Sequence, residues 1–490
     1  MDLRGYKIFM FLMAMGIEGC LVSCVSNSED ELFPDTENVA ETAVTFSPNV
    51  TDAQDTRATY PTNGTGSMTT DKLKDMAFGV FSFYSKETKF FEKANDEAFN
   101  FMHNQKVAWN SLNSYWTYEP LKYWPNDNNP ADNQGAMGSQ THNYLSFFAY
   151  APYTENTDAA TDTDDGIVSI STNDTKSGET YLTYRTSAEY PFIVDKNVDL
   201  LWACRLDLWK TMESGEGYVD GQVKFNFKHA LSKFTITVQG LFDHVDNSDQ
   251  STDYPDDVDA NTRILIESVD FGSSPLMKEG DMYIVPQADG ITLPYWKLKA
   301  ENKMGKEGLT IKDFAINSNI SDAYANNGTF YYHDGETLKG SDATETKELF
   351  DALPTGVTHE EVSLFARSEN EEDDLYYLVI PNNHYIQEKE NDTENGNDPM
   401  QIHIVYYVLT YDANLKLNKI PYCSIVKNDI TATFSNDFVF EPNKQYKLRL
   451  MLGLTTAKFA IEVAEGWEKP IKVADWYIES EKDDSKQLDD

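Results

Sequence analysis

Two cysteines near the start of the sequence, Cys20 and Cys24, lie four residues apart, a spacing that invites comparison with redox and metal sites. Their surroundings favour a different chemistry. Basic residues precede an apolar run at 8–17, which is too short to span a bilayer and is typical of a secretory leader. The letters LVSC, ending at Cys24, resemble the lipobox of lipoprotein signal peptidase, whereas Glu18 makes Cys20 a poor acceptor. Cys24 is therefore predicted to be lipidated on its sulfur and amino group, with an ordinary leader as the alternative.

The residues after Cys24 have the composition of a tether. Residues 28–31, SEDE, resemble the acidic export signal of some surface lipoproteins, although a solvated linker explains them equally well. The polar stretch is interrupted at 43–50 by AVTFSPNV, in which Val44 and Phe46 alternate with polar residues as in a short strand. A turn-rich segment follows.

The net charge excludes one class of partner. Lys and Arg number 40 against 81 Asp and Glu, which gives a formal charge of −41. Such a surface repels phosphate backbones, so no nucleic acid is expected to bind. After residue 17 no apolar run approaches the length needed to span a membrane.

No catalytic constellation is evident, so the chain is not expected to be an enzyme. Phosphate-binding loops, nucleophile elbows and HExxH helices are missing from the sequence. His229 and His403 fall on predicted strands and are interpreted as structural, hydrogen-bonded histidines. The acidic clusters do not have calcium-loop spacing, so no metal and no cofactor are predicted. Cys204 and Cys423 are interpreted as two buried free thiols, with a disulfide as the alternative.

One aromatic cluster could stack against sugar rings. The segment WTYEPLKYW at 116–124 offers four large rings: Trp116, Tyr118, Tyr123 and Trp124. The alternative interpretation is that these rings line a core.

The elements that must position these residues are almost all strands. Apolar, aromatic-rich segments are separated by long polar loops, which favours an all-β fold of antiparallel sandwiches. The segments are 76–84, 144–153, 199–209, 223–240, 263–271, 374–381, 401–411, 444–454 and 458–467. Within 223–240 the alternation changes phase across 229–233, so the chain is expected to pass between sheets or domains there.

The predicted division of the chain follows from these signals. A linker-like segment places the domain boundary near Gly221. The predicted parts are a lipoprotein signal peptide (1–23), a tether or propeptide with the first strand (24–57), an N-terminal β-sandwich (58–221), a C-terminal β-sandwich (222–479) and an acidic tail (480–490).

The order of these motifs resembles the fimbrillin family, the type V pilus subunits. The resemblance covers the chain from the leader to Trp476 and is carried by the lipobox, the tether strand, a basic residue before the first domain, LKYWP, LSFFAYAP, VKFNFKHALSKFTITV and the terminal PNKQYKLRLML and KFAIEVAEGWEKPIKVADW. It implies two transthyretin-like antiparallel β-sandwich domains. It also implies a location on the cell outer membrane, exposed at the surface, and then in a fimbrium.

The resemblance further implies an assembly mechanism. In family members an outer-membrane-associated, trypsin-like protease cuts the lipoprotein precursor, and the first strand leaves the N-terminal sandwich. Carried over to this chain, the cut falls between Arg57 and Ala58, and the removable strand contains Val44 and Phe46. An ordinary linker arginine with a permanently retained strand, as in capping or anchoring subunits, is the alternative.

The vacated groove in family members accepts a donor strand from the C-terminal region of another subunit. The donor candidate here is 470–480, with Val473, Ala474, Trp476 and Ile478 as its pocket-filling residues. These residues alternatively complete the C-terminal sandwich, and the acidic tail keeps a tip or accessory role open. Expected partners are other fimbrial subunits, in a homo- or hetero-polymer, the processing protease, outer-membrane lipid before processing, and a host or bacterial surface ligand. A lipid-anchored glycan-binding protein that does not polymerise is the competing hypothesis.

Overall fold

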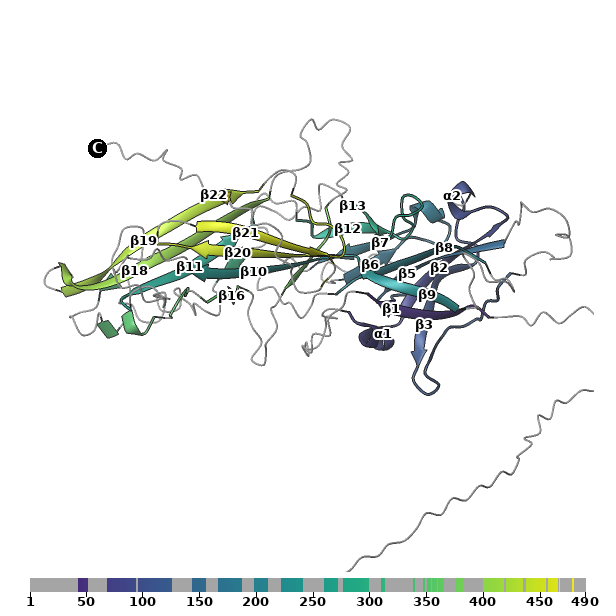
Figure 1. Cartoon of the computed structure of the whole chain (residues 1–490), viewed down its shortest axis with the longest axis horizontal. Helices are drawn as coiled ribbons and strands as arrows, with labels where there is room; N and C mark the ends of the chain where they lie inside the picture. Colours follow the sequence, from purple (N-terminus) through teal and green to yellow (C-terminus); the bar gives the residue numbers. More distant parts are fainter. Residues whose placement is uncertain are drawn as a thin grey trace, which may run out of the picture. The chain divides into compact units, whose positions relative to one another are not determined.

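The computed structural model describes 22 stretches of the chain, beginning at residue 43 (Figure 1). They are residues 43–51, 68–93, 96–125, 143–155, 166–186, 198–209, 222–240, 260–271, 276–298, 310–312, 338–339, 347–348, 350–353, 355–358, 360–364, 376–382, 400–417, 420–434, 438–454, 457–465, 467 and 478–479.

Within these residues the fold is all-β, as the sequence predicted, and the strands form four sheets. A seven-stranded sheet has the order β1 (Thr45–Val50), β9 (Gln222–His229), β8 (Leu201–Leu208), β5 (Asn143–Ala151), β2 (Phe78–Lys86), β3 (Met102–Asn110), β4 (Tyr115–Thr117). A four-stranded sheet has the order β13 (Tyr295–Lys297), β12 (Glu279–Tyr283), β7 (Tyr181–Arg185), β6 (Gly166–Ile170). Short helices are α1 (Thr70–Met76), α2 (Phe90–Lys93) and the 3₁₀ turn η3 (Ser177–Glu179).

The other two sheets come from the second half of the chain. One has the order β16 (Val362–Ser363), β10 (Ser232–Gly240), β20 (Lys444–Leu452), β21 (Ala457–Glu465), β22 (Ile478–Glu479), with β17 (Tyr377–Val379) also paired to β10. The other has the order β14 (Thr310–Lys312), β11 (Thr262–Asp270), β18 (Gln401–Leu417), β19 (Ile420–Thr433), β15 (Leu338–Lys339). Most pairs are antiparallel, but β1 runs parallel to β9, and β10 runs parallel to β20.

The seven-stranded sheet is buried on both faces. On one face Phe81, Tyr150 and Trp202 pack against Leu182 and Trp296 of the four-stranded sheet, which makes a sandwich. The other face carries a separate apolar cluster that includes residues of β1, α1 and the segment after β4. Two-sided burial explains why β2 and β5 are almost continuously apolar in sequence.

The passage between sheets occurs where the sequence changes phase, so this expectation is confirmed. Strand β9 ends at His229 in the seven-stranded sheet, and β10 begins at Ser232 in another sheet. The corner is fixed by a buried hydrogen bond between His229 Nδ1 and Asp199 Oδ2 at 2.8 Å, both side chains being 0% exposed. Trp467 stacks on the imidazole at 3.6 Å. His229 is therefore a structural histidine.

The strand pairing does not follow the domain boundary predicted near Gly221, so that boundary needs correction. Strand β9 lies beyond Gly221 yet pairs with β1 and β8 of the first sheet. Strands β12 and β13 come from 279–297 but pair with β7, and so complete the first sandwich. The first sandwich is thus discontinuous in sequence, because strands close in space can come from distant segments of the chain.

The second pair of sheets encloses its own core and carries one notable polar contact. Ile236, Leu448, Ile404 and Tyr406 belong to a continuous cluster shared by the two sheets. At the other face of β18, His403 Nδ1 lies 3.2 Å from Asp270 Oδ2, and its Nε2 lies 2.6 Å from Asp429 Oδ1. Burial lowers the pKa of His403, but hydrogen bonds to the two carboxylates outweigh it and raise the pKa above its ordinary value.

Candidate functional site

Strand β1 occupies a groove between two segments that are distant in sequence. On one side it pairs parallel with β9, from Thr45 opposite Gln222 to Val50 opposite Phe227. On the other side the Val44 amide donates to the Lys122 carbonyl at 2.8 Å. Ala43 forms an antiparallel bridge with Tyr123. We call this site the strand groove, defined by β9, residues 118–124 and the apolar face between them.

The side chains of β1 alternate between solvent and the groove. Val44 is 0%, Phe46 3% and Val50 7% exposed, and Pro48 is also buried, whereas Thr45 and Asn49 are exposed. This period of two matches the alternation expected of a strand with one buried face. Val44, just before β1, and Phe46 and Val50 within it therefore belong to one apolar cluster.

Phe46 lies at the centre of the groove among four aromatic rings. Its ring stacks on Phe225 at 5.7 Å and an interplanar angle of 10°. It meets Phe78 and Phe147 edge to face at 6.0 and 5.9 Å. The fourth ring, Tyr118, lies at 5.5 Å. Such ring pairs contribute beyond the area they bury.

Tyr118 also binds the backbone at Val44, immediately before β1. Its hydroxyl donates to the Val44 carbonyl at 2.9 Å and accepts from the Lys122 amide at 3.2 Å. Burial raises the pKa of Tyr118 above its ordinary value, so the phenol stays protonated and able to donate. Tyr118 thus joins β1 to the segment that forms the far wall of the groove.

The end of β1 and the start of α1 are neighbours. The Val50 amide donates to Thr70 Oγ1 at 3.0 Å, and Thr70 Oγ1 donates to Asn49 Oδ1 at 3.2 Å. Just before α1, the Met68 amide donates to Asp199 Oδ2 at 2.7 Å. The described residues on either side of 52–67 are therefore neighbours in space. Arg57 and Ala58 belong to this segment and lie outside the described residues, as does Cys24.

The aromatic cluster proposed for sugar binding is largely a core, which agrees with the alternative interpretation of this segment and not with a glycan platform. Tyr118 and Trp124 are 5% and 6% exposed and belong to the apolar cluster behind β1. Trp116 packs against the same cluster, and only Tyr123, at 46%, is well exposed. Tyr118 and Trp124 are therefore not available to form a platform with Trp116 and Tyr123.

The C-terminal donor candidate is described only at its end. Ile478 lies in β22, which pairs antiparallel with β21. Val473, Ala474 and Trp476 lie outside the described residues. The pairing of β22 agrees with the alternative that this segment completes its own sheet.

Within the described residues, little supports a metal site, a membrane-spanning helix or a reactive thiol. No group of three or more His, Cys, Asp or Glu there is arranged to hold a metal ion. No helix in the described part of the chain is long and apolar enough to cross a membrane. Cys204 is a free thiol, half-buried rather than buried, and burial raises its pKa to about 12. Cys204 is therefore a poor nucleophile.

Two parts of the groove were not anticipated from the sequence. The pairing of β1 with β9 joins residues that are far apart in the chain. The only indication in the sequence is that both segments alternate apolar and polar residues, at Phe46 in β1 and at Val223, Phe225 and Phe227 in β9. The hydrogen bonds of Tyr118 to backbone carry no sequence signature at all.

Comparison with known proteins gives one curated relative. No protein-family model matches the chain. The chain is similar to fimbrium subunit Fim1C of Phocaeicola vulgatus, with 26% identity over 229 residues, which are 46% of this chain and 49% of the relative. The chain thus spans about half the length of the curated relative that it matches.

Solved structures of low identity were also found. A fimbrial protein from Bacteroides vulgatus aligns over 87% of this chain and 100% of its own, with 17% identity and a TM-score of 0.48. The fimbrial anchor protein Mfa2 from Porphyromonas gingivalis aligns over 90% of this chain and 99% of its own, with 9% identity and a TM-score of 0.26. With the curated relative as its support, the resemblance of this chain to the fimbrillin family, indicated by its sequence motifs, is confirmed.

Proposed function

We propose that this chain is a structural, tip or accessory subunit of a cell-surface fimbria, in which β1 is removed and a strand from another subunit takes its place. The observation that carries the proposal is the strand groove. Strand β1 is held there by side-chain burial and hydrogen bonds, and residues 52–67 connect it in sequence to the segment that contains α1.

Loss of β1 would leave a surface that only another strand can fill. The outer backbone edge of β9 would lose its partner, the Lys122 carbonyl would lose the Val44 amide, and the faces of Phe78, Phe147 and Phe225 would meet water. Filling four pockets at about 1.5 to 3 kcal/mol each gives a gross gain of roughly 6 to 12 kcal/mol before the entropy of docking. A fibre joint built this way needs no covalent bond.

Processing would begin in the segment that contains Arg57. Because 52–67 starts and ends at neighbouring points, a cut after Arg57 would divide the chain without breaking any pairing of the described sheets. The precursor would travel as a lipoprotein acylated at Cys24 and anchored in the outer membrane, and the cut would separate the folded part from that lipid. Its two sandwiches would be the transthyretin-like domains of the family.

The donor strand would come from the C-terminal segment of a neighbouring subunit. The apolar positions of 470–480 have the alternation that the groove requires. The pairing of β22 with β21 favours a C-terminal segment kept in its own sheet, and this supports a tip or accessory position over a repeating one.

Limited trypsin digestion of the folded chain tests the proposal. We expect a cut after Arg57, release of the fragment containing β1, and association of the remaining chains in light scattering. An Arg57→Gln variant is the matched control and should keep β1 and stay unassociated. Chains that are cut at Arg57 and lose β1 but stay monomeric at high concentration would contradict the donor-strand proposal.

The competing glycan-binding function was assigned to residues 116–124 and loses its support there, because Tyr118 and Trp124 are buried under β1.

A further inference from the structure

Three tyrosines form a row on the outward face of the four-stranded sheet. Tyr181, Tyr283 and Tyr295 lie directly opposite one another on β7, β12 and β13. Their ring centroids are 5.7 Å apart between Tyr181 and Tyr283, and 5.5 Å apart between Tyr283 and Tyr295. Their neighbours in sequence, Leu182, Met282 and Trp296, point into the core instead, so the row lies on the other face.

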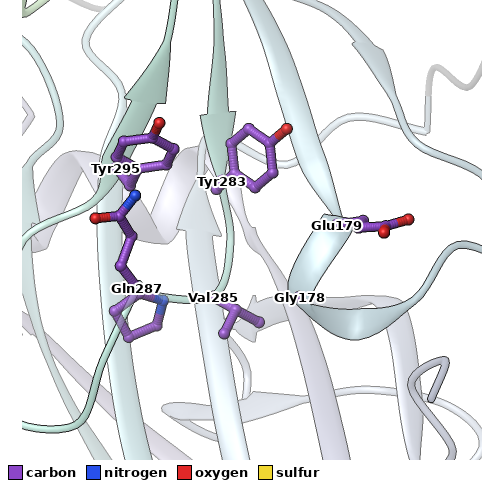
Figure 2. A pocket seen from close by; sticks show the side chains of 7 residues that line it. Gly178, Glu179, Tyr283, Val285, Gln287 and Tyr295 are labelled. Atoms are coloured by element: carbon purple, nitrogen blue, oxygen red, sulfur yellow. The ribbon is translucent and has the colours of Figure 1, made fainter. Parts of the chain in front are cut away.

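A pocket of about 280 Å³ opens at this row. It is lined by Gly178, Glu179, Tyr283, Val285, Pro286, Gln287 and Tyr295. Figure 2 shows Tyr295 and Gln287 on one side, Tyr283 in the middle and Glu179 on the other side. Glu179 and Gln287 are exposed and the two tyrosines are half-buried, so the pocket offers ring surface together with a carboxylate and an amide.

The rest of this sheet face is occupied by polar pairs. Thr183 Oγ1 donates to Asp281 Oδ1 at 2.7 Å, and Arg185 Nη2 lies 2.7 Å from Glu279 Oε2. Aromatic surface is therefore concentrated in one row at one end of the sheet, beside the pocket. Cross-strand tyrosine pairs stabilise a sheet, but they do not require a hollow with an amide and a carboxylate beside them.

We propose that this tyrosine pocket binds a neutral sugar ring of a glycan. The apolar C–H face of a pyranose stacks on a tyrosine ring, while its hydroxyls hydrogen-bond to the Gln287 amide, the Glu179 carboxylate and the tyrosine hydroxyls. The volume lies near the lower end of ligand pockets, about 300 to 1,000 Å³, which suits one ring with the glycan continuing outside. Tyr181 extends the row in the direction in which a second ring would lie.

Charge and geometry argue against other small ligands. A formal charge of −41 and the carboxylate of Glu179 disfavour acidic sugars and phosphates. An ammonium group is best held when rings surround it on several sides, whereas these rings stand side by side on one sheet. Sugar binding at this pocket is a property additional to the proposed fimbrial role, and the fimbrial role does not depend on it.

Affinity electrophoresis of the full, uncut chain tests the pocket. The gels contain soluble neutral polysaccharides, namely galactomannan, xyloglucan, yeast mannan and starch, and we expect at least one to retard the protein. Tyr283→Ala should weaken that retardation about tenfold in apparent Kd, and Tyr283→Phe should retain most of it, since the ring supplies the stacking surface. Tyr115→Ala is the matched control, because Tyr115 is a 49% exposed tyrosine on β4, outside the pocket.

A second variant keeps the proposal testable if Tyr283→Ala unfolds. Gln287 lies in an exposed position after β12, so Gln287→Ala should keep the melting temperature and still weaken retardation. Absence of retardation in every gel would overturn the proposal, as would retardation unchanged in both Tyr283→Ala and Gln287→Ala. Binding of choline in place of sugar, or pairing of two copies through this face in sedimentation, would overturn it as well.

Discussion

Phe46 is the side chain on which the occupancy of the strand groove depends most. It is 3% exposed and touches four aromatic rings, so replacement by alanine leaves a cavity between Phe225, Phe78, Phe147 and Tyr118. Phe to Ala changes in well-packed cores cost about 3 to 5 kcal/mol. If β1 opens by itself, the free energy of its local opening falls by that amount.

The expected consequence is faster hydrogen exchange at β1. Every 1.4 kcal/mol is about tenfold, so Phe46→Ala should speed exchange of a peptide covering 43–51 by more than about a hundredfold. The Val44 and Thr51 amides, which donate to Lys122 and Phe227 carbonyls, report on the two ends of the strand. Strand β20 lies in another sheet and should exchange as before.

A variant on the opposite face of the same strand is the control. Ser47 is half-buried and points away from the groove, so Ser47→Ala should leave exchange at 43–51 within about threefold of the parent. Two results would refute the reasoning. One is an equal rise of exchange in β1 and β20, which means that β1 does not open separately. The other is a rise below about tenfold, which means that Phe46 is not the anchor.

Other consequences follow from single contacts. Tyr118→Phe removes the hydroxyl that binds the Val44 carbonyl and should lower the free energy of unfolding by about 1 to 3 kcal/mol in urea titrations. The raised folded-state pKa of His403 means that its charged form stabilises the fold below the ordinary value near 6.5, and that this contribution is lost as pH rises through the raised pKa. Unfolding midpoints followed over this range should show the loss in the parent and not in His403→Asn. Gly356 has φ +77°, and an added Cβ would lie 2.3 Å from the Ile264 carbonyl oxygen, so Gly356→Ala should lower the melting temperature strongly.

Many of the strands could be predicted from the sequence, because a strand shows local alternation of apolar and polar residues. Val44 and Phe46 predicted β1, and Thr45–Val50 is a strand. The phase change after Phe227 predicted the passage from β9 to β10. Alternation of apolar and polar residues with a period of two indicates that one face of a strand is buried, and this can be recognised without knowing which strand pairs with it.

The pairing of the strands and the sheet to which each strand belongs could not be predicted, because they depend on contacts between distant segments of the chain. Gly221 was a sensible boundary by composition, yet β9, β12 and β13 complete the first sandwich from beyond it. For the same reason the sequence left two interpretations of the aromatic segment 116–124, a sugar-binding surface and a core.

By itself the sequence determined the all-β class, the location of the first strand, the strongly negative net charge, and the resemblance to fimbrial subunits. Only the tertiary structure decided that β1 lies between β9 and residues 118–124, that Tyr118 and Trp124 belong to its groove, and that Tyr181, Tyr283 and Tyr295 form a row beside a pocket. The physical reason is that alternation fixes which face of a strand is buried, whereas the neighbour that buries it is selected by the packing of the whole chain.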